Sequence, residues 1–351
     1  MKIGIVTVYN SDNCGSFLQA YAMKCICERG DNEVVFYKTD ARHPIRQNIK
    51  SIIGYMLRLR WKEALFLLKR TMKFKFAGNV FKCKYPSEYK ADLCILGSDE
   101  IWNVSRKAFA QYSIFWGDGI ECSTLISYAT SVNNAKYSDV FNYRYAKQLK
   151  ERACAVSVRD SMTQECLKSA FNIDSIRVLD PTLALNPENY RKMEIDIPYK
   201  KFILVYASTK GFTDKQCSQI RNFAAKNNLT LISINNYEKW CDVSYPASPG
   251  EFLAFYRKAD YVVTDTYHGT VFSIIYKKQF FCIGRDNKKV MDLISYWGLN
   301  NRNTEESGEW CTSVFEKEIE WTKELALRMD EERKRSIEFI EGAIRSADKK
   351  K

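Results

Sequence analysis

Short apolar runs alternate with longer amphipathic segments along almost the whole chain of 351 residues. The apolar runs have the length of strands, and the segments between them have the length and spacing of helices. Parallel strands need a crossover connection, which is usually a helix, so this alternation predicts an α/β fold with largely parallel sheets. A chain of this length is expected to form two domains.

The alternation falls into two series. Strands are expected at 2–9, 33–38, 92–98, 124–131, 153–159 and 176–179, and then at 202–207, 230–234, 261–266 and 280–283. Helices are expected at 16–29, 137–151, 161–170, 214–227, 249–258, 269–278, 290–297 and 321–347. We therefore predict an N-terminal Rossmann-like domain over 1–185 with a basic helical insertion at 46–84, a C-terminal Rossmann-like domain over 186–320, and a C-terminal helix over 321–351.

Composition excludes several classes of protein. No apolar stretch is long enough to cross a membrane, and no signal peptide opens the sequence, so we expect a soluble, cytoplasmic protein. The 12 cysteines are scattered without a CxxC pair, which favours buried thiols over a disulfide framework or a metal site. With only two histidines, His43 and His268, a histidine-rich metal centre is not expected.

The positive charge is concentrated in one segment. Residues 46–84 contain eleven Lys or Arg and one acid, Glu63, a net charge of +10 out of +12 for the chain. The segment is also rich in Leu, Phe, Trp and Met. Three interpretations remain open: a helix pair with a solvated basic face, peripheral contact with an anionic membrane surface or a lipid-linked diphosphate, and nucleic-acid binding. Nucleic acid is disfavoured because no recognised binding module accompanies the charge.

In open α/β folds, ligands bind beyond the carboxyl ends of the strands, so the segments that follow strands are the candidate sites. In the first, residues 9–21, Asn13, Gly15 and Ser16 open a helix whose N-terminus attracts anions or polar groups. The alternative is plain N-capping by Asn13 or Ser16. The turn has a single glycine and lacks the GxGxxG pattern, so a dinucleotide is a poor candidate ligand.

Two further strand ends carry charged side chains. In residues 96–103, Asp99 and Trp102 suit a sugar, with the carboxylate accepting from hydroxyls and the indole covering an apolar face. Asp99 could also act as a base. The alternative is a capped turn with Trp102 in the core. Arg159 ends an apolar strand and suits a carboxylate or phosphate; the alternative is a salt bridge to Asp160 or another acid.

The fourth segment, residues 262–273, carries the sharpest signal. An apolar strand is expected to end at Thr266, and His268 and Gly269 begin the following helix. Histidine is the side chain best suited to proton transfer near neutral pH. Gly269 would allow a ligand to approach the backbone, and the helix N-terminus offers N–H donors for a phosphate. We therefore predict a functional role for His268.

Five motifs occur in the order seen in the polysaccharide pyruvyl transferase family, which the chain resembles over roughly residues 1–300. They are DNCGSFLQAYA at 12–22, GSDEIWN at 97–103, VRD at 158–160, DPT at 180–182 and TDTYHGTVF at 264–272. The basic segment at 46–84 has no part in the resemblance.

The resemblance implies a fold similar to the two-domain GT-B glycosyltransferases, with two Rossmann-like domains facing a central cleft. It also implies transfer of a pyruvyl group from phosphoenolpyruvate to a sugar, with release of phosphate and formation of a cyclic ketal. The acceptor would be a cell-surface polysaccharide or its lipid-linked precursor. No metal and no organic cofactor are implied. A basic face near an anionic membrane would suit such an acceptor.

The resemblance also assigns roles to residues. It implies that His268 is the general acid and that Asp99 is a candidate base for the sugar hydroxyl. The donor contacts it suggests are Arg159, His268, Gly269 and Thr270. Lys277, Lys278 and Arg285, in the following helix and at the next strand end, are our candidates for a further cation at the donor. The acceptor contacts it suggests are Asn13, Gln19, Asp99 and Trp102. Some relatives have an arginine where Thr266 stands here, so part of the cation set for the donor is unassigned.

Two rival functions remain. One is a nucleotide-sugar glycosyltransferase. Such an enzyme would require, in the second domain, an acidic residue that binds the ribose of the nucleotide and an Arg/Lys pair that binds the diphosphate. The other is a protein without catalytic activity that binds an anionic glycan or lipid through the basic segment. Binding of phosphoenolpyruvate or of a nucleotide sugar, and its response to loss of His268, would distinguish the three.

Overall fold

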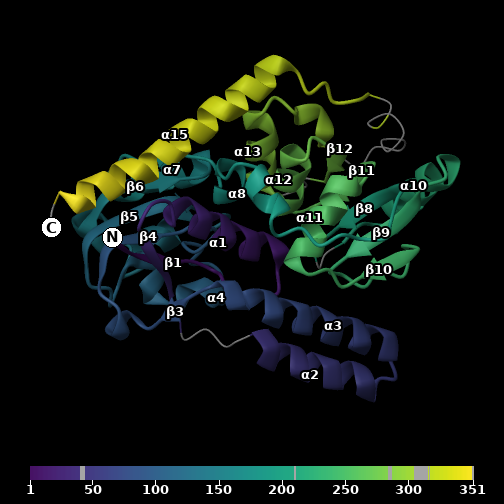
Figure 1. The fold of residues 1–351 in the computed structure, drawn as a ribbon, viewed down its shortest axis with the longest axis horizontal. Helices are drawn as coiled ribbons and strands as arrows, with labels where there is room; N and C mark the ends of the chain where they lie inside the picture. The colour runs from purple at the N-terminus through teal and green to yellow at the C-terminus, as the bar shows by residue number, and fades with distance from the viewer. Residues whose placement is uncertain (40–43, 209–210, 284–286, 304–314, 316, 350–351) are drawn as a thin grey trace. The chain divides into compact units, whose positions relative to one another are not determined.

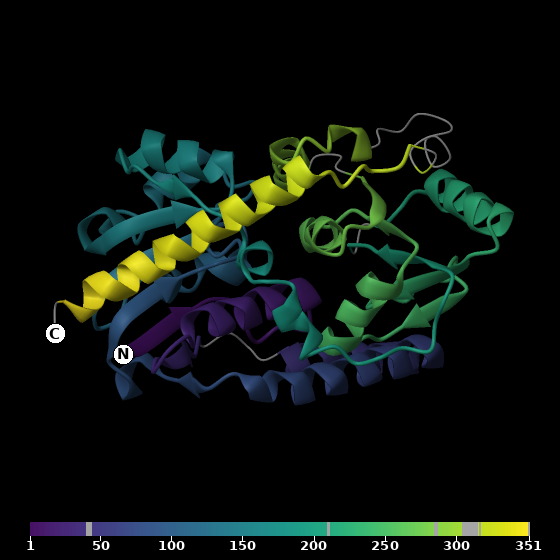
Figure 2. The ribbon, with the colours of Figure 1, turned by 45° about the horizontal axis from the view of Figure 1, so that its top comes forward.

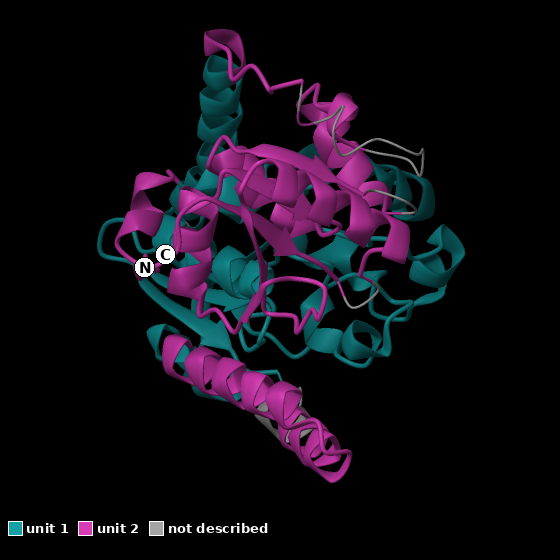
Figure 3. Ribbon diagram, turned by 90° about the vertical axis from the view of Figure 1, so that its right-hand side faces the viewer, with its two compact units in different colours: residues 1–42, 78–185, 326–351 teal, residues 43–77, 186–325 magenta. Residues whose placement is uncertain are grey.

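The computed structural model describes residues 1–39, 44–208, 211–283, 287–303, 315 and 317–349 (Figure 1). It divides into two compact units, and neither is continuous in sequence. Unit 1 comprises residues 1–42, 78–185 and 326–351, and unit 2 comprises residues 43–77 and 186–325 (Figure 3). Each unit is built on its own sheet.

Unit 1 contains a parallel sheet of seven strands in the order β3-β2-β1-β4-β5-β6-β7. The strands are β1 (Lys2–Val6), β2 (Glu33–Tyr37), β3 (Cys83–Lys84), β4 (Ala91–Leu96), β5 (Cys122–Thr130), β6 (Ala153–Val158) and β7 (Ile176–Arg177). The central strands β1 and β4 are almost completely buried, because helices cover both faces of a sheet of this kind. Their continuous apolar runs are the sequence signature of such strands.

The helices of unit 1 connect these strands and cover the sheet. They are α1 (Cys14–Cys27), α4 (Lys107–Ala110), α5 (Tyr137–Asn142), α6 (Gln148–Arg152), α7 (Ser161–Phe171) and α8 (Pro181–Ala184), with short 3₁₀ turns at Gly78–Val80, Pro86–Glu88 and Ser113–Trp116. The long helix α15 (Lys323–Asp348) runs along unit 1 as well (Figure 2). It is held by the Ser336 hydroxyl, which accepts from the Leu179 N–H at 2.9 Å, and by Arg333, which donates to the Leu183 carbonyl at 3.2 Å.

Unit 2 contains a parallel sheet of five strands in the order β10-β9-β8-β11-β12. The strands are β8 (Phe202–Tyr206), β9 (Thr230–Ile234), β10 (Val243–Tyr245), β11 (Tyr261–Thr264) and β12 (Gln279–Cys282). The helices are α2 (Pro44–Leu57), α3 (Trp61–Ala77), α9 (Glu188–Arg191), α10 (Asp214–Lys226), α11 (Pro249–Lys258), α12 (Tyr267–Ile275) and α13 (Lys288–Tyr296), followed by a 3₁₀ turn at Asn300–Arg302. Capping boxes begin α10 at Thr213 and α11 at Ser248.

Both sheets are doubly wound from the middle. In unit 1 the chain moves outward in one direction from β1 to β3 and in the other from β4 to β7; in unit 2 it does so from β8 to β10 and from β11 to β12. The order reverses between β1 and β4 and between β8 and β11. The carboxyl ends of strands at such a reversal are the usual location of a ligand site. Each unit therefore has one candidate location fixed by its topology.

The predicted two-series α/β fold with parallel sheets and a long C-terminal helix is confirmed. Most elements lie within a few residues of their expected bounds, and α11 has the bounds expected for 249–258. The helix expected at 137–151 is instead two short helices, α5 and α6. The strands β3 and β10, of two and three residues, were not predicted, whereas the two-residue β7 lies within the strand expected at 176–179.

The compact units differ from the predicted domain boundaries at the basic segment. Residues 43–77 belong to unit 2, where Lys73 pairs with Glu251 of α11 at 2.7 Å and Arg70 donates to the Asn235 carbonyl at 2.6 Å. Phe66 packs edge-on against Tyr237, with ring centroids 5.7 Å apart. These contacts join residues about 165 to 180 positions apart, which no local pattern reveals.

The C-terminal helix is the second difference. Most of α15 belongs to unit 1 through the contacts of Ser336 and Arg333 given above. Among the described residues, no helix is both long enough and apolar enough to span a bilayer.

Candidate functional site

In unit 1, a buried polar network lies at the carboxyl ends of β1 and β4, where the strand order reverses. The Thr7 hydroxyl donates to the Ser98 carbonyl at 3.0 Å. Gln19 of α1 is fully buried; its amide nitrogen donates to Thr7 and to the Val8 and Ser16 carbonyls, and its amide oxygen accepts from Ser98. Because these contacts occupy both ends of its amide, Gln19 organises the loops at this edge rather than forming part of an open surface.

The first turn of α1 is capped by Asn13, as in the alternative that the sequence analysis gave for this segment. The Asn13 side-chain oxygen accepts from the Gly15 N–H at 2.8 Å and from the Ser16 N–H at 3.2 Å. The Ser16 hydroxyl reaches from α1 to the loop after β4, where it donates to the Asp99 carboxylate at 2.8 Å. Asn13 therefore shapes the helix start, and Ser16 joins that start to Asp99.

Asp99, Arg159 and Asp180 form a buried ionic cluster at the ends of three strands. Arg159 follows β6, and its guanidinium lies 2.9 Å from the Asp180 carboxylate and 3.5 Å from the Asp99 carboxylate. Its side chain is 1 % exposed. The salt bridge offered as the alternative for Arg159 exists, but its partners are Asp180 and Asp99. Asp160 instead caps α7 by accepting from the Thr163 N–H.

The backbone around Asp99 is in an uncommon conformation. Asp99 has a φ of 76°, which non-glycine residues adopt only where their surroundings hold them there. Its backbone carbonyl accepts from the Ser131 N–H at 3.1 Å. At the neighbouring Gly97, with φ at 119°, a Cβ would lie 2.2 Å from the Tyr128 carbonyl oxygen. The fold thus aims the Asp99 carboxylate at Ser16 and Arg159 with little freedom.

Trp102 packs as core and does not offer a face to a sugar. Its side chain is completely buried and stacks on Trp116 with ring centroids 5.0 Å apart and an interplanar angle of 17°. Its indole N–H donates to the Phe115 carbonyl at 2.9 Å. The predicted sugar contact of Trp102 thus gives way to the alternative stated for it, because both ring faces and the polar edge are covered.

In unit 2, the junction between β11 and α12 is built from hydroxyl groups. The Thr264 hydroxyl donates to the Tyr206 carbonyl of β8 at 2.6 Å and accepts from the Thr266 N–H at 3.1 Å. Thr266 is the N-cap of α12, and its hydroxyl accepts from the Gly269 N–H at 3.0 Å. Thr266 therefore serves as a helix cap.

The small residues of this junction serve its packing. A Cβ on Gly269 would lie 2.0 Å from the Thr264 hydroxyl and 2.5 Å from the Thr266 hydroxyl, so only glycine fits. The N–H of Gly269 donates to the Thr266 hydroxyl in this cap. Thr270 is fully buried, and its hydroxyl donates to the Thr266 carbonyl at 3.1 Å. The donor contacts predicted for Gly269 and Thr270 remain predictions, and each residue has a structural role that explains its identity.

His268 lies in the first turn of α12 and is partly exposed. The ring of Tyr267 packs edge-on against it, with centroids 5.3 Å apart and an interplanar angle of 87°. Nearby on the same sheet edge, Asp265 accepts from both the N–H and the hydroxyl of Ser208, each at 2.6 Å. Ser208 and Asp265 lie at the reversal between β8 and β11, so His268 stands beside the location that topology marks for a ligand.

Two of the predicted donor cations are at the wrong edge of the sheet. The nine residues of α12 rise about 14 Å, so Lys277, which follows its last turn, lies far from His268 at the other end. Lys278 directly precedes β12, and its ammonium group donates to the Arg257 and Ala259 carbonyls. Lys277 and Lys278 therefore cannot bind an anion held at the start of α12. Arg285 lies outside the described residues.

Among the described residues, no group of three or more His, Cys, Asp or Glu side chains is arranged to hold a metal ion. The sequence did not indicate Asp180, Ser208 or Asp265 as individual site residues, and it indicated Ser16 only at the start of the first helix, as a possible cap. Asp265 comes directly after β11 and Asp180 three residues after β7, and these positions were the available signal for the two acids. Ser208 carries no signal beyond ordinary turn composition.

The fold places the chain in a wider structural class. It is similar to UDP-GlcNAc 2-epimerase from Methanocaldococcus jannaschii, with a TM-score of 0.54 and 11% identity over 90% of this chain and 92% of that one. It is also similar to UDP-GlcNAc 2-epimerase from Neisseria meningitidis, with a TM-score of 0.51 and 10% identity over 90% of each chain. The fold is thus GT-B-like.

The particular family is given by the sequence. The model of the polysaccharide pyruvyl transferase family matches residues 13–287, and the chain belongs to this family. The resemblance inferred from the five motifs is confirmed. No curated protein matches the sequence significantly. Membership implies a transferase that acts in polysaccharide pyruvylation.

Proposed function

We propose that the protein transfers a pyruvyl group from phosphoenolpyruvate to two hydroxyls of one sugar in a cell-surface polysaccharide or its lipid-linked precursor. The observation that carries the proposal is the strand-to-helix junction at 264–270, with a partly exposed histidine in the first turn of α12, inside the segment that matches the family. The first turn of a helix favours an anionic ligand, and histidine can transfer a proton near neutral pH.

The proposed reaction begins at the methylene carbon of phosphoenolpyruvate. The His268 imidazolium donates a proton to this carbon, which leaves a cationic carbon beside the phosphate ester and the carboxylate. A sugar hydroxyl attacks that carbon, and its proton passes to a base. A second hydroxyl of the same sugar then displaces inorganic phosphate as the carbon–oxygen bond to phosphate breaks. The proton of this hydroxyl leaves with the phosphate, and the product is a cyclic ketal. The phosphate and carboxylate of the bound donor favour the protonated form of the histidine.

Asp99 is the proposed base for the sugar hydroxyl. Its carboxylate is held in place by the Ser16 hydroxyl at 2.8 Å and by the Arg159 guanidinium at 3.5 Å. Arg159 is so deeply buried between two carboxylates that its role in the proposal is to position Asp99. The predicted contact of Arg159 with the donor, and those of Asn13 and Gln19 with the acceptor, require these side chains to leave the contacts described above.

The first experiment measures thermal stability with and without millimolar phosphoenolpyruvate or UDP-N-acetylglucosamine, in the wild type and in His268→Ala. A ligand at 100 times its dissociation constant stabilises by about 2.7 kcal/mol, which raises Tm by a few degrees. We expect a shift with phosphoenolpyruvate that is altered in the variant. A shift with the nucleotide sugar alone would instead make the protein a glycosyltransferase.

A second experiment tests the role of the histidine. If His268 is the general acid, kcat/KM for phosphoenolpyruvate depends on a single group between about pH 6 and pH 8. Phosphate release can be followed with p-nitrophenyl hexosides, which offer free 4- and 6-hydroxyls, as trial acceptors. A flat profile over that range would remove His268 from the proton-transfer step.

A further inference from the structure

The helical hairpin formed by α2 and α3 exposes an unusual amount of apolar surface. Ten of the 17 large apolar side chains that are exposed among the described residues belong to residues 44–77, which are 34 of the 351 residues. Scattered exposed apolar residues are normal, but a concentration of this kind marks a surface that is covered in use. The proposed reaction assigns no role to this hairpin.

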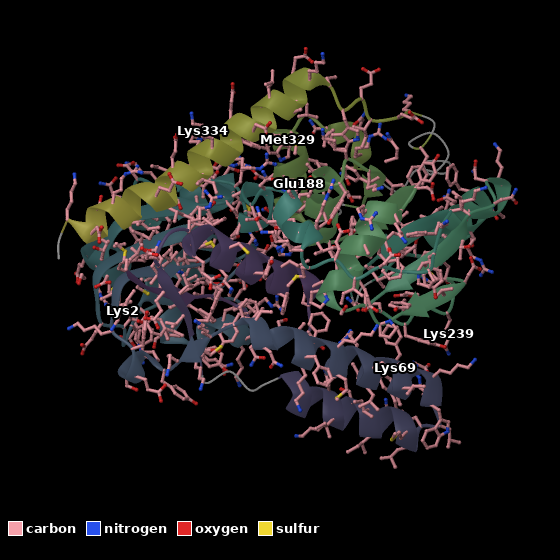
Figure 4. All side chains as sticks on the ribbon, in the orientation of Figure 1. Lys2, Lys69, Glu188, Lys239, Met329 and Lys334 are labelled. Atoms are coloured by element: carbon pink, nitrogen blue, oxygen red, sulfur yellow. The ribbon has the colours of Figure 1, made fainter. Side chains whose placement is uncertain are left out.

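On α3, the exposed apolar side chains form one stripe. They are Trp61, Leu65, Leu68, Met72 and Phe76, each between 41% and 66% exposed. At 100° per residue they fall within an arc of about 80°. Lys75 borders the arc on one side, and Lys69 and Lys62 border it on the other, and all three lysines are exposed. Figure 4 labels Lys69 on this helix.

The opposite face of α3 is attached to unit 2. Phe66 and Phe74 are buried, and Lys73 and Arg70 are bound to Glu251 and to the Asn235 carbonyl. The exposed stripe is therefore not a core face left open by a loose helix. The helix has two apolar faces, and only one of them is used within the unit.

The helix α2 repeats this pattern and packs on α3. Ile49, Ile53, Met56 and Leu57 recur at helical spacing and are 39% to 81% exposed. The Asn48 amide donates to the Thr71 hydroxyl of α3 at 2.9 Å, which joins the two helices. The apolar surface is thus a property of the hairpin as a whole.

The positive charge of the hairpin indicates an anionic partner. Its exposed charged side chains are all positive: Lys50, Arg58, Arg60, Lys62, Lys69 and Lys75. The single acid, Glu63, is buried and paired with Arg60 at 3.0 Å. A second copy of this surface would meet it with like charge. Apolar side chains bordered by lysines on a helix lying flat are the signature of an interfacial helix on an anionic bilayer.

We propose that the α2–α3 hairpin docks the protein on the surface of an anionic lipid bilayer, with the Trp61–Phe76 stripe in the headgroup region and the lysines on the lipid phosphates. The hairpin is attached where β9 and β10 end, because Asn235 follows β9 and Tyr245, which ends β10, accepts a contact from Lys73. This is the carboxyl edge of the five-stranded sheet, the edge at which His268 lies. Docking therefore brings that edge to the membrane surface.

The test uses the full-length protein and vesicles of phosphatidylcholine with or without about 30 % phosphatidylglycerol. We expect co-sedimentation with the anionic vesicles at low salt, little with the neutral ones, and partial release at about 0.5 M NaCl. Lys62→Glu/Lys69→Glu/Lys75→Glu should weaken binding on the order of a hundredfold. The matched control is Lys215→Glu/Lys226→Glu/Lys334→Glu, which makes the same charge change at exposed lysines elsewhere and should bind like the wild type.

The apolar stripe is tested separately with Trp61→Ser/Leu65→Ser/Leu68→Ser, against Ile176→Ser/Leu327→Ser, which alter exposed apolar residues outside the hairpin. We expect the stripe variant to lose the fraction that stays bound at high salt. We also expect the total tryptophan emission of the wild type to shift to the blue on binding, and that of the stripe variant, which lacks Trp61, to shift less. Absence of vesicle binding, equal loss in the charge control, or unchanged binding of the stripe variant would each overturn the inference. A dimer in solution that these serines dissociate would make a second copy the partner instead.

This outcome is separable from that of the proposed function. The phosphoenolpyruvate-dependent thermal shift needs no vesicles, and we expect it to be unchanged in the stripe variant. Loss of the shift with retained vesicle binding would count against the pyruvyl-transfer proposal alone.

Discussion

The carboxyl edges of the two sheets are built from different chemistry although their strand orders follow the same rule. In unit 1, Arg159 lies between two carboxylates, and the charged groups at the strand ends are bound to one another. In unit 2, the helix cap beside His268 is made of the Thr264 and Thr266 hydroxyls and of a glycine with no room for a side chain. We call this cap the neutral edge. A charged side chain at a strand end can thus be fully engaged in holding the fold, as Arg159 is, whereas a helix cap built from hydroxyls can leave a histidine beside it partly exposed, as it does His268.

The largest expected effect is on catalysis at the neutral edge. His268→Ala should reduce phosphate release from phosphoenolpyruvate with a p-nitrophenyl hexoside by about 10²–10⁴-fold, because a general acid contributes that much. His268 is partly exposed, so we expect little change in Tm without ligand. A variant that retains wild-type turnover would break the comparison, because the neutral edge would then have no chemical role.

Removing the cation from the ionic cluster of unit 1 is expected to lower the stability of the fold. Arg159→Met removes the guanidinium and leaves the Asp99 and Asp180 carboxylates buried together, which should cost about 3–5 kcal/mol in the free energy of unfolding. The matched control is Arg106→Met, whose side chain is 56% exposed where it contacts Glu100, and which should cost about 1 kcal/mol or less. Urea unfolding measures both; similar values for the two would show that the cluster is not structural.

The tight packing of the neutral edge gives a smaller effect. Gly269→Ala places a Cβ against the Thr264 and Thr266 hydroxyls and should destabilise by about 1–3 kcal/mol. Gly54→Ala in α2, where no atom lies within 4 Å of the new methyl group, should instead stabilise by about 0.5–1 kcal/mol. If thermal unfolding shows the same change in stability for both substitutions, a side chain at position 269 fits beside Thr264 and Thr266, and the tight packing described here is wrong.

The smallest expected effect concerns the ionisation of Glu251, which lies in unit 2 away from the neutral edge. Burial alone would raise the pKa of Glu251, but hydrogen bonds from Lys73, Ser248 and Tyr245 together lower it below its ordinary value of 4.5. A carboxyl group with a lowered pKa stabilises the fold above its unfolded pKa, and that contribution is lost as the pH falls through the folded pKa.

We therefore expect the stability difference between wild type and Glu251→Gln, measured by urea unfolding, to be largest near pH 7 and to shrink below about pH 4. Glu188→Gln, at a carboxylate that is 65% exposed, serves as the control and should differ from wild type by about 0.5 kcal/mol or less at neutral pH. A difference for Glu251→Gln that does not change with pH would mean that the Lys73 pair contributes little to holding the hairpin.

Much of this molecule could be predicted from local pattern. The alternation of strands and helices, the positions of the strand ends and the caps at Asn13 and Ser248 depend on residues only a few positions apart. The separation of Lys277 from His268 could also be predicted, because His268 was expected at the start of a helix and Lys277 near the end of that helix. The family could also be recognised from motifs that are each continuous in sequence.

What only the tertiary structure decided depends on contacts between distant residues. The strand order brings Asp99 and Asp180 to Arg159, and the packing of Trp102 on Trp116 removes it from any surface. The same holds for the attachment of the basic hairpin to unit 2 through Lys73 and Glu251. The sequence by itself determined which side chains stand at strand ends; packing decided which of them are buried and bound to each other and which are partly exposed, because burial and charge pairing are settled only when the chain has folded.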